Sequence, residues 1–353
     1  MNPNTPDSRP TDRDREIEDW LAHVIGRDYR MTPASSDASF RRYFRIYHEG
    51  STQILMDAPP QHEDCRPFIH AQSLLSDAAV SVPKIIEANP ERGLLLLGDL
   101  GTLSYLDELN EKNCDGLYGD ALNALARMQT RIPANTVPEY DLVKLDNELR
   151  LFPDWFLGKH LNAEISDDLQ RTLDECFETL TAVCLEQPRV FVHRDYHSRN
   201  LMRLEARNPG VLDFQDAVGG PVTYDLVSLF RDVYIAWPAA RVDEWVRGYF
   251  KQLACQCDDL AGVDEAEFMR WFDLTGVQRH LKVAGIFCRL YYRDGKPGYL
   301  RDIPLTLRYL TEVGAGRAET LPLIDALGAL GVSKRLEVAN AAILGAGAAG
   351  GGP

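Results

Sequence analysis

The spacing of apolar and polar residues changes near Gly101. Before that point, apolar residues recur at helical spacing over 12–25 and then in short alternating or continuous runs, which predict strands. A helical pattern at 68–77 interrupts these runs, which lie at 40–47, 52–56, 82–88 and 93–101. We therefore expect a small unit of mixed helix and strand over 12–101, ending in a glycine-containing connector.

Helical periodicity dominates the remainder of the chain. Apolar residues recur at three- and four-residue steps over 117–130, 169–185, 224–236, 242–253 and 265–292. One strand-and-loop block at 189–216 interrupts them. The pattern predicts a mainly helical unit over 102–330 with one short β insert, so the fold class is α+β. The segments 1–11 and 338–353 are poor in large apolar side chains, and we expect both to be disordered.

Composition limits the class of protein. The 353 residues allow about two domains, and 45% hydrophobic with 26% charged residues is typical of a folded protein. A net charge of −15 argues against general binding to nucleic acid or to an anionic membrane. The 7 cysteines show no paired ligand spacing, and no stretch is apolar enough to cross a membrane or to act as an export signal. We expect a cytoplasmic protein with reduced cysteines.

One short block carries the polar residues best suited to catalysis. His193, Arg194 and Asp195 are followed five residues later by Asn200, and Asp213 lies thirteen residues beyond. Phosphoryl transfer needs a carboxylate that accepts the proton of the acceptor hydroxyl, and oxygen ligands for a magnesium ion that bridges the phosphates. Two carboxylates and one amide near loop ends therefore fit a site that combines a base with a metal.

The pattern H-x-D-x-x-x-x-N with a D-F pair at 213–214 resembles the protein-kinase-like fold, and in particular the aminoglycoside phosphotransferase and choline kinase superfamily. The resemblance implies two lobes, with a small antiparallel sheet in the N-terminal lobe and helices in the C-terminal lobe. It also implies that Asp195 is the catalytic base and that Asn200 and Asp213 hold Mg²⁺. His193 would then brace the loop.

Several further segments are similar to the N-acetylmuramate/N-acetylglucosamine anomeric sugar kinases of bacterial cell-wall recycling. They are ASFRRYFR (38–45), MDAPP (56–60), HRDYHSRNLM (193–202), LDFQDAVGGPVTYDL (212–226) and QRHLKVAGIFCRLYYRDGK (278–296). This resemblance implies a kinase that uses ATP and Mg²⁺ to phosphorylate the anomeric hydroxyl of either amino sugar. The partner would be a small-molecule amino sugar, with no nucleic acid, membrane or obligate protein partner.

The phosphate-binding parts depart from the protein-kinase pattern. No glycine occurs between Arg27 and Glu49, and the strand position where a lysine would lie reads Ile54-Leu55-Met56. Backbone N–H groups, hydroxyls and guanidinium groups can bind phosphate in place of these parts. The residues that offer such groups nearby are Ser35, Ser36, Ser39, Arg41, Arg42 and Arg45.

Among these arginines we favour Arg42, which shares a strand face with Phe40 and Phe44 and should therefore point inward. The alternative is that the arginines form a solvated strand edge protected by charge. The adenine is expected against the connector, since ligand pockets commonly lie between two lobes. The candidate residues there are Leu97, Asp99 and Leu100, whose leucines would equally suit a core strand.

A basic stretch late in the chain is the candidate wall of an acceptor site. Between Arg279 and Arg308 the chain has seven Lys or Arg against two Asp. At helical spacing several of these cations share a face. That face is either a solvated surface or the wall of a pocket for an anionic acceptor, such as the lactyl carboxylate of N-acetylmuramate. The expected substrate-binding residues are His197, Arg199, Asp216 and Arg289.

Three other functions stay open at this point. His193, Asp195 and His197 could be ligands of a hydrolase metal. The acceptor could be another small alcohol, such as an aminoglycoside, choline or a different sugar, although a polycationic aminoglycoside would require an acidic pocket. The missing lysine and glycine-rich loop would also suit a nucleotide-binding pseudokinase, but such a protein has no chemical need for Asp195, Asn200 and Asp213.

Overall fold

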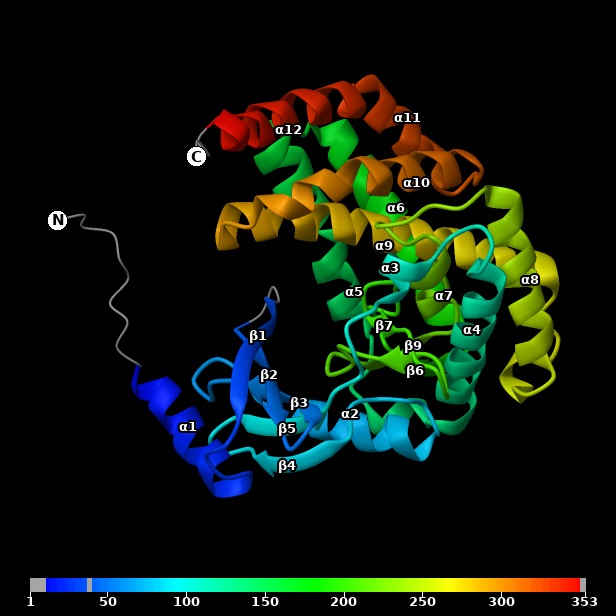
Figure 1. Ribbon diagram of the computed structural model, residues 1–353. Helices are drawn as coiled ribbons and strands as arrows, with labels where there is room; N and C mark the ends of the chain where they lie inside the picture. Colours follow the sequence, from blue (N-terminus) through cyan, green and yellow to red (C-terminus); the bar gives the residue numbers. More distant parts are fainter. Residues whose placement is uncertain (1–10, 37–39, 350–353) are drawn as a thin grey trace.

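An antiparallel sheet and a group of helices form the two parts of the molecule (Figure 1). The computed structural model describes residues 11–36 and 40–349. The sheet has five strands in the order β1-β2-β3-β5-β4, and every neighbouring pair is antiparallel. The strands are β1 (Arg30–Ser36), β2 (Arg42–His48), β3 (Ser51–Asp57), β4 (Ile85–Asn89) and β5 (Leu94–Gly98).

Alternation along the strands gives this sheet two apolar faces. One face packs on helix α1 (Asp12–Val24) through Ile46 and Leu55. The opposite face, which carries Met56, joins the core of the helical part together with helix α2 (Arg66–Asp77). Because neighbouring residues of a strand point to opposite faces, the residue next to an α1-facing position points toward the helical part.

The remainder of the chain is mainly helical, and no helix in the described ranges is both long and apolar enough to cross a membrane. Its α-helices are α3 (Tyr105–Glu108), α4 (Cys114–Arg131), α5 (Leu142–Leu149), α6 (Asp167–Glu186), α7 (Tyr224–Phe230), α8 (Ala239–Ala254), α9 (Glu265–Asp294), α10 (Ile303–Ala315), α11 (Leu321–Ala329) and α12 (Val332–Ala349). The 3₁₀ turns are η1 (Ala134–Thr136), η3 (Asp258–Leu260) and η4 (Pro297–Asp302), and η2 (Phe152–His160) is a π-helix.

Helix α9 is the central support of the helical part. It begins at the N-cap Asp264, whose carboxylate accepts a hydrogen bond from the N–H of Glu267 at 2.8 Å. It ends at Gly295, whose φ of 68° is the left-handed conformation that commonly terminates helices. The helix packs against α6, α7, α10 and η2. Even charged residues of its middle turns, such as Arg279 and Lys282, are therefore buried.

Two small sheets carry the strand-and-loop block that interrupts the helices. Strand β6 (Arg189–Val192) pairs with β9 (Val218–Pro221), and β7 (Leu201–Met202) pairs with β8 (Gly210–Val211). One loop joins β6 to β7 and another joins β8 to β9. The two loops that contain the predicted catalytic residues therefore leave adjacent short strands, which brings those residues together.

The structure differs from the predicted elements in two informative places. The apolar pattern does not predict β1 because Pro33 interrupts it, and this edge strand has a register shift between Pro33 and Ser35, a place that tolerates proline. The helix predicted over 224–236 ends at Phe230. There Asp232 accepts hydrogen bonds from the N–H and hydroxyl of Ser198, which ties the chain to the loop 193–200 instead.

The prediction of disorder over 338–353 is wrong for the residues that the structure describes there. Helix α12 extends to Ala349, and alanine, which is frequent in this segment, has the highest helix propensity. Asn340 is buried and donates from its amide to the backbone oxygen of Leu300 at 3.0 Å. Residues 1–10 and 350–353 lie outside the described residues, and Thr11 caps α1.

Candidate active site

A buried carboxylate holds the backbone of the loop 193–200. Asp225, in the first turn of α7, accepts hydrogen bonds from the N–H of His193 at 2.7 Å and of Arg194 at 3.0 Å. Burial raises the pKa of Asp225 to about 7, against the lowering effect of these two N–H groups. The two bonds support a left-handed φ of 77° at Arg194, a conformation that costs a non-glycine residue on the order of 1 kcal/mol.

Both ring nitrogens of His193 are used inside the protein. Nε2 donates to the backbone oxygen of Leu212 at 2.9 Å, and Nδ1 accepts from the N–H of Asp195 at 3.3 Å. Burial lowers the pKa of His193 to about 4, so the ring is neutral at pH 7 and can be donor and acceptor at once. This arrangement favours the bracing role over the metal-ligand alternative, because neither nitrogen is left to bind a metal.

The carboxylate of Asp195 lies among cations. Nη2 of Arg279 is 3.8 Å from its Oδ1, and the side chains of Asp195 and Arg279 are 45% and 3% exposed. Burial opposes ionisation of Asp195, but the charges of Lys282, His197 and Arg279 outweigh it and lower the pKa to about 2. Asp195 is therefore ionised at neutral pH and can accept a hydrogen bond from a hydroxyl group.

Asn200 and Asp213 come together beside this base. Nδ2 of Asn200 donates to the backbone oxygen of Asp195 at 2.9 Å and lies 3.5 Å from Oδ2 of Asp213. With the nitrogen engaged in this way, the amide oxygen of Asn200 is the atom left for a cation. Asp213 has a left-handed φ of 63°, and Gln215 donates to its Oδ1 at 2.7 Å. A carboxylate and an amide oxygen are ligands of the type that Mg²⁺ prefers, so the donor set fits that ion.

Arg42 does not point toward the helical part, and the prediction that it does is wrong. It lies on the α1 face of β2, where it pairs with Asp57 at 2.6 Å and with Asp14 of α1 at 3.3 Å. Arg13 of α1 pairs with the same Asp57 carboxylate, which is fully buried. Phe44 shares this face, as predicted. Arg42 therefore ties α1 to the sheet.

Arg41 takes the opposite orientation. Its Nη2 lies 3.1 Å from Oε2 of Glu63, just before α2, and the two side chains are 9% and 16% exposed. Burial lowers the pKa of Arg41, but neighbouring groups that include Glu63 and Asp213 outweigh it and raise that pKa. Arg41 directly precedes β2 and Glu63 precedes α2, so this ion pair joins the sheet side to the segment before α2 within the field of Asp213.

The connector after β5 is held by an ion pair. Asp99 accepts two hydrogen bonds from Arg45, at 2.6 and 3.1 Å, and a third from the N–H of Gly101 at 2.9 Å. Burial raises the pKa of Asp99, but these bonds outweigh it and lower that pKa. The Asp99 carboxylate is thus engaged in shaping the connector, and Arg45 is engaged with it.

The structure does not bring the other predicted nucleotide-binding residues together, because the strand register places Ser36 and Leu97 toward opposite ends of the sheet. Leu97 is a buried residue in the middle of the ladder between β3 and β4. The side chain of Leu100 lies against β8, because a Cβ placed on Gly210 would be only 2.8 Å from its Cδ1. Ser35 and Ser36 end β1, and Ser39 lies outside the described residues.

The residues expected on the acceptor side lie in three separate places. The ring of His197 packs edge-on against Tyr234 at 5.3 Å, and the guanidinium of Arg199 lies 3.5 Å over the same ring. Nδ1 of His197 is buried and has no hydrogen-bond partner among the described residues. Asp216 is exposed and accepts a hydrogen bond from Gln215 at 3.3 Å, which places it on the Asp213 side of the site.

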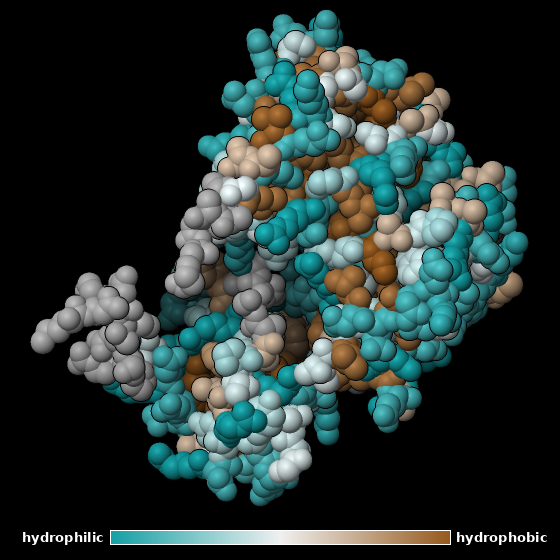
Figure 2. Space-filling view, turned by 45° about the horizontal axis from the view of Figure 1, so that its top comes forward, coloured by the Kyte–Doolittle hydropathy of each residue, from teal (hydrophilic) through white to brown (hydrophobic). Residues whose placement is uncertain are grey.

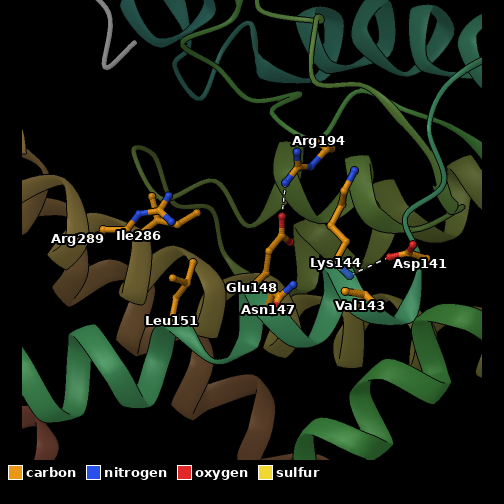
Figure 3. A pocket seen from close by; sticks show the side chains of 9 residues that line it. All are labelled: Asp141, Val143, Lys144, Asn147, Glu148, Leu151, Arg194, Ile286 and Arg289. Carbon is orange, nitrogen blue, oxygen red and sulfur yellow. Dashed lines mark hydrogen bonds and ion pairs between the residues drawn. The ribbon is translucent and has the colours of Figure 1, made fainter. Parts of the chain in front are cut away.

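The fourth residue, Arg289, lines a pocket of about 470 Å³ between α5 and α9. Figure 2 shows the surface hollowed between the sheet and the helices, and Figure 3 shows the pocket with Arg194 above α5. Glu148 of α5 binds Arg194, the hydroxyl of Tyr140, and Nζ of Lys282 at 3.2 Å. Burial raises the pKa of Glu148, but the charges of Lys282 and Arg194 outweigh it and lower that pKa.

Helix α5 is not among the elements predicted from the sequence, and Glu148 is therefore not among the predicted site residues. The available signal is local: leucines follow the N-cap Asp141 at helical spacing, at 142, 145 and 149. The pairing of Glu148 with Arg194 joins residues 46 positions apart. No spacing rule predicts such a contact.

Comparison with known proteins identifies the family. The model of the phosphotransferase enzyme family matches residues 30–266, and the chain belongs to this family. A protein of Pseudomonas putida named N-acetylmuramate/N-acetylglucosamine kinase is 48% identical over 306 residues, which cover 86% of this chain and 89% of that protein. A protein of the same name from Neisseria meningitidis serogroup B is 42% identical over 335 residues, covering 92% and 98%.

Solved structures confirm the fold class. The choline kinase LicA from Streptococcus pneumoniae has a TM-score of 0.59 at 11% identity and covers 86% of this chain and 100% of that chain. An ADP-bound aminoglycoside phosphotransferase, APH(2'')-Ib, has a TM-score of 0.56 at 14% identity and covers 85% and 99%. The protein has the predicted α+β, protein-kinase-like fold and is a phosphotransferase.

Proposed function

We propose that this protein transfers the γ-phosphoryl group of ATP to the anomeric hydroxyl of N-acetylmuramate and N-acetylglucosamine. The relatives that carry this name are similar over most of both chains, at 48% and 42% identity. The observation that carries the proposal is that Asn200 joins the other two residues, since its amide nitrogen contacts both the backbone oxygen of Asp195 and the carboxylate of Asp213. The proposed use of ATP also supports a cytoplasmic location for the protein.

Asp195 is the proposed base. Its low pKa keeps it ionised, so it orients the acceptor hydroxyl by accepting a hydrogen bond and takes the proton as the bond to phosphorus forms. An anomeric hydroxyl is more acidic than an ordinary alcohol, so a base with so low a pKa suffices. Most of the rate enhancement then comes from position and electrostatics rather than from base strength.

Asn200 and Asp213 are the proposed holders of the nucleotide's magnesium ion, through the amide oxygen and the carboxylate. When bound, the ion supplies charge neutralisation for the phosphates. Arg41 supplies a second positive charge from the sheet side, and Glu63 holds it in place. These residues replace the lysine that the chain lacks in its strands.

The experiment that tests the function follows the reducing end of the sugar. Purified protein is mixed with ATP, Mg²⁺ and either amino sugar, and both ADP and reducing sugar are measured. Phosphorylation of the anomeric oxygen removes the reducing end in step with ADP release, whereas phosphorylation of the six-hydroxyl leaves it. ADP release without loss of reducing sugar would contradict the proposed position. Turnover only with choline or an aminoglycoside would contradict the proposed acceptor.

A further inference from the structure

The pocket between α5 and α9 contains two cations that form no ion pair with any described residue. Among the described residues, neither Arg289 nor Lys144 has a side-chain ion pair or hydrogen bond, and Nε of Arg289 is buried without a partner. Burial and the nearby charge of Arg293 lower the pKa of Arg289. A half-buried guanidinium without a partner loses hydration and gains nothing in return, unless a ligand supplies the missing acceptor.

The acidic residues of the same pocket are already engaged. Glu148 is shared by Arg194 and Lys282, and Asp141 caps α5 by accepting from the N–H of Lys144 at 2.8 Å. Figure 3 shows Glu148 turned toward Arg194 and Asp141 turned toward the backbone of Lys144, with Arg289 across the pocket from them. The free charge of the pocket is therefore positive.

One wall of the pocket is apolar, and the segments that form it pack closely together. Val143, Leu151 and Ile286 line it beside the cations. Gly285 of α9 allows the backbone of Leu151 to come close, because a Cβ at that position would lie 2.4 Å from the carbonyl carbon of Leu151. This combination of a small apolar wall and unpaired cations suits an organic anion better than inorganic phosphate.

The pocket lies beside the candidate catalytic site, through two of its lining residues. Arg194, which lines it, precedes Asp195 in the chain. Lys282 lies 3.2 Å from the pocket residue Glu148, and its charge is the strongest of those that lower the pKa of Asp195. Lys282 is itself buried, so it joins the two places from below rather than lining either one. An acceptor whose hydroxyl lies at Asp195 is therefore close enough to direct a substituent toward the pocket.

We infer that this pocket binds the carboxylate of the lactyl substituent of N-acetylmuramate, with Arg289 and Lys144 as its cationic partners. The inference rests on the proposed function and adds which residues distinguish the two sugars. N-acetylglucosamine lacks this substituent, so it leaves the pocket to water. Arg289 and Lys144 then determine affinity for the acidic sugar and have little effect on the neutral one.

The test compares Arg289→Gln with wild type on both sugars. A hydrogen bond between charged groups contributes about 1.5–3 kcal/mol, so the KM for N-acetylmuramate should rise about tenfold or more, while the KM for N-acetylglucosamine stays the same. Arg293→Gln is the matched control, because Arg293 is exposed on the same helix and pairs with Asp294 outside the pocket. Lys144→Gln should shift the KM in the same direction. Wild type should bind the methyl ester of N-acetylmuramate as weakly as Arg289→Gln binds the acid.

The outcomes separate this inference from the proposed function. If wild type phosphorylates both sugars but Arg289→Gln and Lys144→Gln change neither KM, or raise both equally, the pocket assignment is wrong and the function stands. If wild type binds the methyl ester as well as it binds the acid, the pocket assignment is also wrong, whatever the variants show. If wild type phosphorylates N-acetylglucosamine but not N-acetylmuramate, the pocket assignment is wrong, but the protein is still an amino-sugar kinase. If wild type phosphorylates neither sugar, both the pocket assignment and the proposed function are wrong.

Discussion

The guanidinium of Arg279 lies 3.8 Å from the carboxylate of Asp195, and Arg279 is almost fully buried under the catalytic loop. Nε and Nη1 of Arg279 have no hydrogen-bond partner among the described residues. Burying a cation in this way is costly unless its charge is used. Here it is used by Asp195, whose ionised form it favours.

Replacing Asp195 by Asn tests the base directly. The amide keeps the size of the side chain but cannot take a proton, so kcat should fall by about 10²–10⁴-fold. Affinity for ATP should change little, because Asn200 and Asp213 are still present. Steady-state kinetics with varied ATP separate the two effects. A kcat within a few fold of wild type would show that another group accepts the proton.

Replacing Arg279 by Met tests the electrostatic role of that cation. Loss of the charge should raise the pKa of Asp195, so the acid limb of the pH profile of kcat/KM should move to higher pH. Arg279→Lys should restore most of the wild-type profile, because it restores the charge. Equal loss of activity at every pH in both variants would indicate a purely structural role.

The pair Arg41→Gln and Arg42→Gln tests the phosphate contact. Arg41 precedes β2 and lies within the field of the candidate metal ligand Asp213, so its loss should raise the KM for ATP about tenfold. Arg42 faces α1, so its loss should leave that KM unchanged and lower the melting temperature through the Asp57 cluster. Kinetics and thermal denaturation of the two variants check this. The reverse pattern would restore Arg42 as the phosphate-binding residue.

Because His193 and His280 are buried and neutral in the folded protein, we predict that the free energy of unfolding decreases as pH falls. The folded-state pKa values of His193 and His280 are lowered to about 4 and about 3, so each contributes stability that is complete above pH 6.5 and is lost as pH falls from there toward those values. Asp225, with a pKa raised to about 7, changes stability in the opposite direction over the same range. The histidines should outweigh this single carboxyl group.

The variant His193→Gln isolates one of these contributions. Removing the group should reduce the slope of unfolding free energy against pH by on the order of 1 kcal/mol per pH unit between pH 6.5 and 4. Denaturant titrations at several pH values measure the slope in both proteins. Parallel curves for the two proteins would mean that His193 is protonated in the fold.

The fold and the centre of the site are predictable from the sequence because both depend on local patterns. Helical periodicity and short alternating runs separate the two parts of the chain. The spacing of Asp195, Asn200 and Asp213 predicts the site correctly because the two loops that contain them connect the same two pairs of short strands. What alternation cannot tell is which face of a strand is the inner one. Both faces of β2 are covered, one by α1 and the other by the helical part. The sequence therefore does not show which of Arg41 and Arg42 points toward α1 and which toward the helical part.

Contacts between distant segments are the part that sequence patterns do not contain. Glu148 joins Arg194 and Lys282 from three different elements. The basic face predicted from spacing proves to be mixed: Arg279 and Lys282 are buried under the catalytic loop, Arg289 lines a pocket, and Arg293 is exposed. Only the packing of α9 against α5 and η2 separates these roles.

The central claim is that the phosphoryl group goes to the anomeric oxygen. The most direct measurement uses N-acetylmuramate labelled with carbon-13 at C1 and follows the C1 signal by NMR during turnover with ATP and Mg²⁺. We predict that the C1 signal of the product is split by coupling to phosphorus and that Asp195→Asn slows its formation by about 10²–10⁴-fold. An unsplit C1 signal beside stoichiometric ADP would place the phosphate elsewhere and contradict the account.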